Sequence, residues 1–457
     1  MDYSATNTVL WTVVIQLGLI AGALLVALGL RQKLGFIRRS MMPIAVLAGF
    51  LLLLAKYLGL VKVDGPFMEM LVYHGIALGF IAMSLRVPPE KSGARGDLTG
   101  LKSGAVIVSS YMVQGVTGLL ITLGLSYTLM PGLFKASGLL LPMGYGQGPG
   151  QANNIGSSYE SLGFAGGRSF GLAIAAAGYL VACVVGVVIL NVLSRRGTIP
   201  APRAEKQEAP GVDFFQSPEE IPVSDSVDKL SVQLAMVLLV YLATYLAAWG
   251  ITAGLGAVAP GLAKTLNSLI WGFNFIIGAA LAMLVRTLLE KAKKAVWIRR
   301  QYQNNYLLNR LSGFFFDLMI VAGIASIELE DLQGLWVPFL LLAVAGGVVT
   351  WLHLSFVCKK VYKDYYYEGL ISMYGMLTGT ISSGVLLLRE IDPGLETPAA
   401  NNLITGSSFG IVLGAPVLIL VGLAPQSTGN TWLVLAIAAA YWALLDLVIL
   451  KLHRRKK

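Results

Sequence analysis

Leu141-Pro-Met-Gly-Tyr-Gly-Gln-Gly-Pro-Gly-Gln-Ala-Asn-Asn-Ile-Gly156 is the most informative part of this chain. It lies between two long apolar runs, yet it contains five glycines, two prolines, two glutamines and two asparagines. Glycine and proline do not sustain a regular helix here, so several backbone groups lose their internal hydrogen-bond partners. Within a bilayer, such irregular backbone is tolerated only inside protein or beside a water-filled cavity. The stretch therefore predicts the tip of a re-entrant hairpin at about residues 127–163.

The composition of the whole chain predicts an all-α, polytopic membrane protein. Of its 457 residues, 56% are hydrophobic and only 13% are charged. The net charge of +10 does not indicate nucleic-acid binding, because the basic residues lie in short loops between apolar runs. Cys183 and Cys358 fall in or beside these runs, so we expect no disulfide or metal site. The first run is long enough to remain in the bilayer rather than act as a cleaved signal peptide.

The first half of the chain, residues 1–193, predicts five membrane spans together with the hairpin. Clusters of arginine and lysine follow the first, third and fifth spans. The positive-inside rule places these loops in the cytoplasm and the N-terminus outside, provided that the hairpin does not cross the membrane. The hairpin is therefore expected to enter from the outer face of the plasma membrane. The expected spans are residues 8–30, 41–60, 66–85, 103–125 and 167–193.

The second half of the chain, residues 230–430, repeats this scheme after a proline-rich, charged cytoplasmic linker at residues 194–229. A second interrupted run at about residues 365–398 predicts a hairpin that enters from the cytoplasmic side. Residues 431–457 add one further span and a basic tail, which places the C-terminus inside. The expected spans of this half are residues 230–252, 264–289, 311–327, 335–357 and 402–423.

Five spans and a hairpin in each half, in opposite orientations, are typical of an inverted repeat. A short local match agrees with this interpretation. Gly166-Gly-Arg-Ser-Phe-Gly-Leu172 follows the first hairpin, and Thr405-Gly-Ser-Ser-Phe-Gly-Ile411 follows the second. The shared Ser-Phe-Gly is brief, so the expected topology carries most of the argument.

Several motifs resemble the bacterial sodium/glutamate symporter family, and the likeness spans most of the chain. Besides the first hairpin tip, they are Leu30-Arg-Gln-Lys-Leu34 leading into Met42-Pro-Ile-Ala-Val-Leu-Ala-Gly49, Ile327-Glu-Leu-Glu-Asp-Leu-Gln-Gly-Leu335, and Tyr374-Gly-Met-Leu-Thr-Gly-Thr-Ile-Ser-Ser-Gly384. The resemblance implies a two-domain, elevator-type carrier that imports glutamate with sodium, with both hairpin tips near substrate and ion. It also implies a homodimer.

The first tip departs from the family pattern, because Gly146-Gln-Gly-Pro-Gly150 stands where a Gly-Gly-His-Gly-Thr-Gly-like sequence is expected. The preferred prediction is Na⁺-coupled symport of glutamate or a similar small anion. The alternatives are a carrier for another amino acid or organic acid, and a channel or regulatory membrane protein with a carrier fold. A channel is expected to show a ring of like residues, whereas the two tips here differ in sequence.

The two tips combine freed backbone groups with amide and hydroxyl side chains, which suits an anion and a monovalent cation. The alternative is that their glycines only allow close helix packing. Arg389 could bind a substrate carboxylate or lie at the interface, and Asp317 within a span could bind an ion or form a structural pair. The residues expected to bind substrate are Gln147, Gln151, Asn153, Asn154, Thr378, Thr380, Ser382, Ser383 and Arg389. Those expected to bind Na⁺ are Gly146, Gly148, Gly379 and Asp317.

No catalytic constellation is predicted. His74, His353 and His453 are scattered along the sequence, and no Ser/His/Asp grouping, metal-ligand spacing or phosphate loop is evident. We therefore expect a protein that is not an enzyme, with no cofactor and no metal other than Na⁺ as coupling ion.

Overall fold

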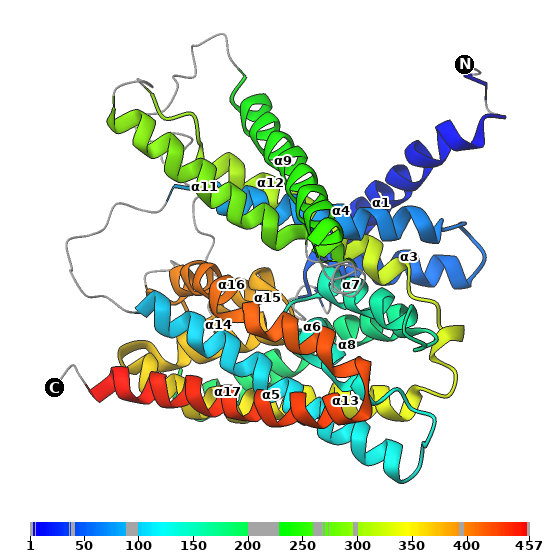
Figure 1. The fold of residues 1–457 in the computed structure, drawn as a ribbon. Helices are drawn as coiled ribbons and strands as arrows, with labels where there is room; N and C mark the ends of the chain where they lie inside the picture. The colour runs from blue at the N-terminus through cyan, green and yellow to red at the C-terminus, as the bar shows by residue number, and fades with distance from the viewer. Residues whose placement is uncertain are drawn as a thin grey trace. The chain divides into compact units, whose positions relative to one another are not determined.

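The computed structural model describes residues 3–4, 6–35, 37, 42–87, 99–199, 228–258, 267, 270–272, 274–295, 300–392 and 397–454 (Figure 1). The structure is 84% helical, and the described residues contain no strand. Within them, nine helical segments are long and apolar enough to cross a membrane. The protein is therefore an all-α, multi-pass membrane protein, which confirms the predicted class. The nine are α1 (Thr8–Lys33), α4 (Gly65–Ser84), α5 (Thr99–Tyr127), α8 (Gly167–Arg195), α9 (Lys229–Val258), α12 (Asn305–Ala325), α13 (Trp336–Val361), Phe409–Gln426 of α16 and η5, and Thr428–Lys451 of α17.

The remaining helices are shorter or more polar. Several of the expected spans coincide with elements that start or end elsewhere: the span at 41–60 is the short helix α3 (Ile44–Tyr57), and the span expected at 264–289 corresponds to α11 (Asn274–Lys294). The last expected repeat span is α16 (Ala399–Leu423), which begins before residue 402. The predicted linker lies outside the described residues from 200 to 227.

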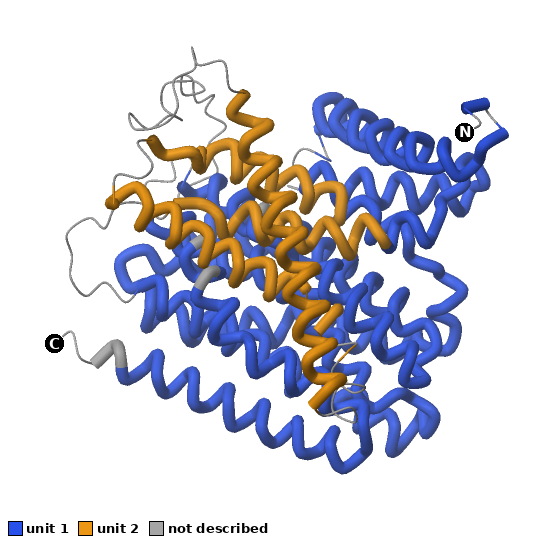
Figure 2. The backbone as a smooth tube through the Cα atoms, turned by 45° about the horizontal axis from the view of Figure 1, so that its top comes forward, with its two compact units in different colours: residues 1–69, 96–204, 320–457 blue, residues 70–95, 205–319 orange. Residues whose placement is uncertain are grey.

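The chain divides into two compact units (Figure 2). Unit 1 comprises Met1–Glu69, Gly96–Ala204 and Ile320–Lys457, and unit 2 comprises Met70–Arg95 and Glu205–Met319. The boundary falls inside α4 and inside α12. Each unit therefore draws on both halves of the sequence, and neither corresponds to one of the predicted repeats.

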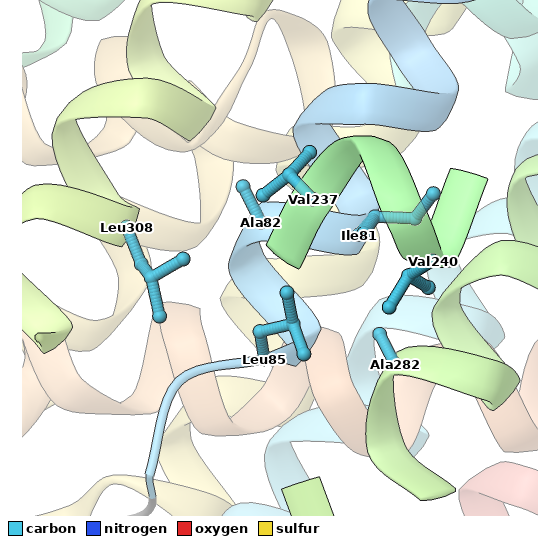
Figure 3. Packing of buried hydrophobic residues seen from close by; sticks show 7 residues of the cluster. All are labelled: Ile81, Ala82, Leu85, Val237, Val240, Ala282 and Leu308. Atoms are coloured by element: carbon cyan, nitrogen blue, oxygen red, sulfur yellow. The ribbon is translucent and has the colours of Figure 1, made fainter. Parts of the chain in front are cut away.

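Unit 2 is held by an apolar core that joins α4, α9, α11 (Asn274–Lys294) and α12 (Figure 3). Two polar interactions support this packing. Arg286 Nη1 donates to the backbone oxygens of Ser84 and Arg86, at 3.3 and 3.2 Å, beyond the end of α4. His74 Nδ1 and the Tyr241 hydroxyl are hydrogen-bonded at 2.5 Å, in agreement with a packing role for that histidine. The core residues are Ile81, Ala82, Leu85, Val237, Val240, Ala282 and Leu308.

Unit 1 is organised around α5, the most buried of the nine candidate spans. Two hydrogen bonds show that α5 and α13 are antiparallel. Ser103 near the start of α5 is bonded to Tyr362 at the end of α13, and Gln114, further along α5, is bonded to the earlier residue Thr350. The aromatic pair Tyr127–Trp432 joins the C-terminal end of α5 to the N-terminal end of α17 (Thr428–Arg454). Helix α17 therefore also runs antiparallel to α5.

The first broken region folds into a helical hairpin. Its arms are η1 (Lys135–Leu139) with α6 (Leu140–Tyr145), and α7 (Pro149–Glu160). Along α8, the closest backbone approaches are Gly156 to Gly167 and Ala152 to Gly171, which makes α7 antiparallel to α8. Gly144 packs instead against Ala175, further along α8, while Leu140 lies beside Gly171. Helix α6 is therefore parallel to α8, and the chain reverses direction at residues 146–148.

The second broken region is also a hairpin, with arms α14 (Tyr366–Thr378) and α15 (Ile381–Leu388). A Cβ on Gly384 would lie 2.4 Å from the Ser372 oxygen, and one on Gly375 would lie 2.9 Å from Gly384 Cα. The two arms are thus in backbone contact, and the chain reverses at Gly379–Thr380. The base of this hairpin packs with the C-terminal end of α8 in an apolar cluster of Leu190, Ile199, Ile371, Leu387, Leu388, Ile391 and Ala399.

Candidate functional site

The tips of the two hairpins meet beside the middle of α8. A Cβ on Gly178 would lie 2.3 Å from the Thr378 oxygen, so the second tip touches the backbone of α8. A Cβ on Gly148 would lie 3.7 Å from the Tyr179 hydroxyl and 4.0 Å from Thr380 Cγ2. The first hairpin approaches this point from the N-terminal end of α8, and the second approaches it from the C-terminal end. All these residues belong to unit 1.

Four helix ends lie at the paired tips. Helices α7 and α15 begin there, and helices α6 and α14 end there. Gly148 caps α7 with a backbone φ of +85°, which residues other than glycine rarely adopt. Pro149 is the first residue of the helix. Helix N-termini carry partial positive charge, and C-termini carry partial negative charge. The tips therefore offer backbone amides for an anion and backbone carbonyls for a cation.

Polar side-chain atoms near the tips are buried and lack a hydrogen-bond partner in the described chain. Gln151 is 1% exposed and Ser383 is 2% exposed, and each lies in the first turn of the helix that leaves its tip. An unsatisfied buried polar group costs about 1–3 kcal/mol of stability, so a group of them at one place marks a candidate binding site. The atoms concerned are Gln114 Oε1, Gln151 Oε1 and Nε2, Asn153 Oδ1, Tyr374 OH, Thr380 Oγ1 and Ser383 Oγ.

Gln114 links the site to the regular helices around it. Its Nε2 donates to Thr350 Oγ1 at 2.8 Å and to the Leu377 oxygen, one residue before the second tip, at 2.9 Å. Its Oε1 remains free of a partner. Tyr374, one turn before that tip on α14, presents a second such atom. Neither residue was predicted from the sequence: Gln114 lies on an uninterrupted helix that carries no local signal, and Tyr374 lies in the second interrupted run but a full turn before its break.

The remaining predicted tip residues lie where the hairpins reverse, but they differ in what they offer. Gln147 is half-buried at the first tip. Thr378 Oγ1 already donates to the Tyr374 oxygen at 2.7 Å, and Asn154 is buried with an interaction partner of its own. Ser382 lies in the first turn of α15, and its side chain lies outside the described part. Gly146 and Gly379 directly follow the last residues of α6 and α14.

Of the two remaining predicted site residues, Arg389 lies at the far end of its hairpin arm, and Asp317 belongs to the other unit. Arg389 is exposed and follows the last residue of α15, about 12 Å along the helix from the tip at 1.5 Å per residue. Asp317 lies on α12 within unit 2, with an exposed side chain, whereas both tips belong to unit 1. Arg389 was assigned to the site because it is close to the tip in sequence, and Asp317 because a charge within a span is costly. Neither criterion fixes a position in space.

A further polar cluster was not expected from the sequence, because its members come from α5, α13 and α17. The Ser109 hydroxyl donates to Asp446 Oδ1 at 2.5 Å and lies 3.1 Å from His353 Nε2. His353 Nδ1 is 3.9 Å from Asp446 Oδ2. Ser109, His353 and Asp446 therefore form a grouping that was not predicted from the sequence. The grouping does not have the geometry of a nucleophilic triad, because the serine donates its proton to the carboxylate rather than to the imidazole.

Comparisons with known proteins do not assign a family to the chain. No protein-family model matches the sequence, and no curated protein matches it significantly. Among the described residues, no group of three or more histidine, cysteine, aspartate or glutamate side chains could hold a metal ion.

Proposed function

We propose that this protein is a secondary transporter that couples Na⁺ to the import of glutamate or a similar small organic anion. The observation that carries the proposal is the meeting of two hairpin tips beside the middle of α8, with buried, unpartnered polar atoms on both hairpins. Carriers built from inverted repeats bind substrate near the middle of the membrane, at interrupted helices. The resemblance to the sodium/glutamate symporter family supports the same assignment.

Each part of the site has a proposed role. The substrate carboxylates lie at the N-termini of α7 and α15, where Gln151, Asn153 and Ser383 supply side-chain hydrogen bonds. Na⁺ binds the backbone carbonyls at the C-terminal ends of α6 and α14, which is the end of a helix that attracts cations. Gln114 Oε1 and Tyr374 OH complete the site from the surrounding helices.

The two hairpins approach α8 from opposite ends, which also supports an inverted-repeat topology. The basic helix ends support a C-terminus in the cytoplasm. Antiparallel packing within unit 1 brings the basic ends of three helices to the same side: Lys102 on α5, Lys360 on α13 and Lys451 on α17. Under the positive-inside rule this side is cytoplasmic. In an elevator-type carrier, the part that holds both hairpins moves with the substrate, so we assign that role to unit 1 and expect a homodimer.

Charge arithmetic sets the stoichiometry of coupling. Moving one elementary charge across 100 mV is worth about 2.3 kcal/mol. One Na⁺ cancels this term for a singly charged anion and leaves about 1.4 kcal/mol for each tenfold Na⁺ gradient. A second Na⁺ adds both terms, about 3.7 kcal/mol, which supports roughly 500-fold further accumulation. Because a helix ends at each of the two tips and the last carbonyls of a helix lack intrahelical partners, we expect at least two Na⁺ for each substrate anion.

Uptake by the purified protein in proteoliposomes tests this function. A panel of labelled amino acids and organic acids is offered with and without an inward Na⁺ gradient and an inside-negative potential. We expect saturable uptake of glutamate or a related acid, a sigmoidal dependence on Na⁺, and stimulation by the potential. Uptake that ignores both Na⁺ and potential contradicts coupling, and an ion current without uptake of any acid favours a channel.

A further inference from the structure

The cluster of Ser109, His353 and Asp446 is buried within unit 1 and lies outside the hairpin tips. The side chain of His353 is 3% exposed and that of Asp446 is 18% exposed. The Trp442 ring packs edge-on against the imidazole, with ring centroids 6.1 Å apart. Ionisable side chains inside membrane spans are costly, and they commonly serve ion or proton pathways. We therefore expect this cluster to have a function separate from that of the hairpin tips.

The heavy-atom geometry favours one proton in the cluster beyond those of neutral histidine and ionised aspartate. Because the Ser109 hydroxyl points at Asp446 Oδ1, Ser109 Oγ accepts from His353 Nε2, which must carry a hydrogen. A neutral imidazole then has a bare lone pair on Nδ1, and this atom faces Asp446 Oδ2 at 3.9 Å. A lone pair facing a carboxylate is repulsive. A proton on Nδ1 or on the carboxylate removes the repulsion and makes the cluster neutral.

One charged group acts on the histidine of the cluster among the residues that the structure describes. Asp446 is the charged group that acts on His353 among the described residues. Helix α16, which packs against α5 and α17, has no titratable side chain, and η5 has none either. On the three helices themselves, the titratable side chains are Lys102, Tyr111 and Tyr127 on α5, Cys358, Lys359 and Lys360 on α13, and Tyr441, Lys451, His453 and Arg454 on α17. On the other elements packed against these helices, they are Lys135, Tyr145, Arg168, Tyr179, Cys183, Arg195, Lys363, Asp364, Tyr365, Tyr366, Tyr367, Glu368 and Tyr374.

The cluster is also connected to the second hairpin tip. Ser109 is five residues before Gln114 on α5, about 7.5 Å along the helix, and His353 is three residues after Thr350 on α13. Gln114 donates to both Thr350 Oγ1 and the Leu377 oxygen beside the tip. Two helices and one shared side chain therefore join the cluster to the tip.

We propose that Ser109, His353 and Asp446 form a proton-binding site, and that the proton bound there is carried with the substrate. In the loaded state the cluster is neutral. On release, one proton passes to water from Nδ1 or from the carboxylate, and the cluster becomes singly negative. The membrane disfavours a lone negative charge, so the cluster takes up a proton again before unit 1 returns. Proton transport rests on the proposed carrier function, whereas proton binding does not.

Thermal unfolding of the purified protein across a pH series tests proton binding without any substrate. The folded protein holds one proton that the unfolded chain releases above about pH 6.5, the ordinary titration range of histidine. Stability must therefore fall as the pH rises. Over the pH range in which the folded protein holds the extra proton, the ratio of folded to unfolded protein should fall about tenfold for each pH unit. Asp446→Asn removes the acid with little change of shape, and we expect it to abolish this slope. An unchanged slope in Asp446→Asn overturns the proposal.

Three further variants make the result decisive. His74→Gln removes an intramembrane histidine bonded to Tyr241 in unit 2, and it should leave the slope unchanged. Ser109→Ala removes the hydroxyl that fixes a hydrogen on His353 Nε2, so a neutral imidazole can carry its hydrogen on Nδ1, toward Asp446, and the slope should be lost. If Asp446→Asn does not fold, His353→Gln takes its place. We expect this variant to shift the pH range over which stability falls by at least about one pH unit, since the carboxylate then holds the proton alone. The same slope at the same pH contradicts the proposal.

Proton transport is tested in proteoliposomes that contain a pH-sensitive dye. During Na⁺-driven uptake of the acid identified in the uptake panel, the wild-type protein should acidify the lumen. Asp446→Asn should take up the acid without acidification, and equal acidification by both proteins contradicts a carried proton. If the wild-type protein takes up no acid at all, the carrier function fails, while the unfolding experiment still decides whether the cluster binds a proton.

Discussion

Replacing Gly178 with alanine is expected to reduce uptake by about 100-fold. The added methyl group would lie 2.3 Å from the Thr378 oxygen, so α8 and the second tip must separate by close to 1 Å. Displacement of this size at a site of fixed geometry costs about 100-fold in function. Overpacking costs about 1–3 kcal/mol, so the variant should still fold. The measurement is the initial rate of uptake per folded protein in proteoliposomes.

Gly186→Ala is the matched control for this substitution. Gly186 lies two turns further along α8, and a Cβ there would lie 2.7 Å from Leu387 Cδ1. The end of a leucine side chain can rotate away, whereas the backbone carbonyl beside Gly178 cannot. We expect near-normal uptake by Gly186→Ala. If both variants lose uptake equally, helix packing in general explains the loss and the tip contact has no special role.

Replacing Gln151 with leucine is expected to weaken substrate binding while making the protein more stable. A hydrogen bond to a charged ligand is worth about 1.5–3 kcal/mol, or about 10- to 150-fold in affinity. Both polar atoms of Gln151 are buried and have no hydrogen-bond partner among the described residues, so the leucine removes an unfavourable burial of about 1 kcal/mol or more. Substrate affinity and thermal unfolding of the same preparations measure the two effects.

Gln16→Leu serves as the control, because Gln16 is also buried but fully hydrogen-bonded. Its Nε2 donates to the Lys62 oxygen at 3.0 Å, and its Oε1 accepts from the Asp64 backbone at 3.2 Å. The leucine variant should lose stability and keep normal affinity, which is the reverse of Gln151→Leu. A loss of stability in Gln151→Leu with unchanged affinity shows that Gln151 is structural.

The position of both tips could be predicted from sequence because glycine and proline interrupt helices locally. Gly148 and Pro149 decide where α7 begins, and Gly379 ends α14, whatever surrounds them. The amide and hydroxyl residues next to these breaks were therefore placed correctly at the tips. Their burial and lack of partners could not be predicted, since both depend on how α8 and the two hairpins pack.

Residues on regular helices carry no comparable signal. Gln114 lies at the candidate site only because α5 packs beside the second tip, and the burial of the Tyr374 hydroxyl likewise depends on packing. In the sequence, Ser109 is 244 residues from His353 and 337 residues from Asp446. Three helices bring these residues together. Arg389 shows the opposite error, because a residue close to a tip in sequence lies at the far end of a helix.

Thiol labelling of one cysteine at each tip tests most directly whether a single binding site lies between the tips. Gln147→Cys and Thr380→Cys place a thiol on either hairpin, and native Cys183 and Cys358 are buried, so background labelling is low. Arg389→Cys is the control at the exposed base of the second hairpin. We expect the transported acid with Na⁺ to slow labelling of both tips at the same concentration and to leave Arg389→Cys unaffected. Protection of one tip alone, or of neither, would contradict a shared site.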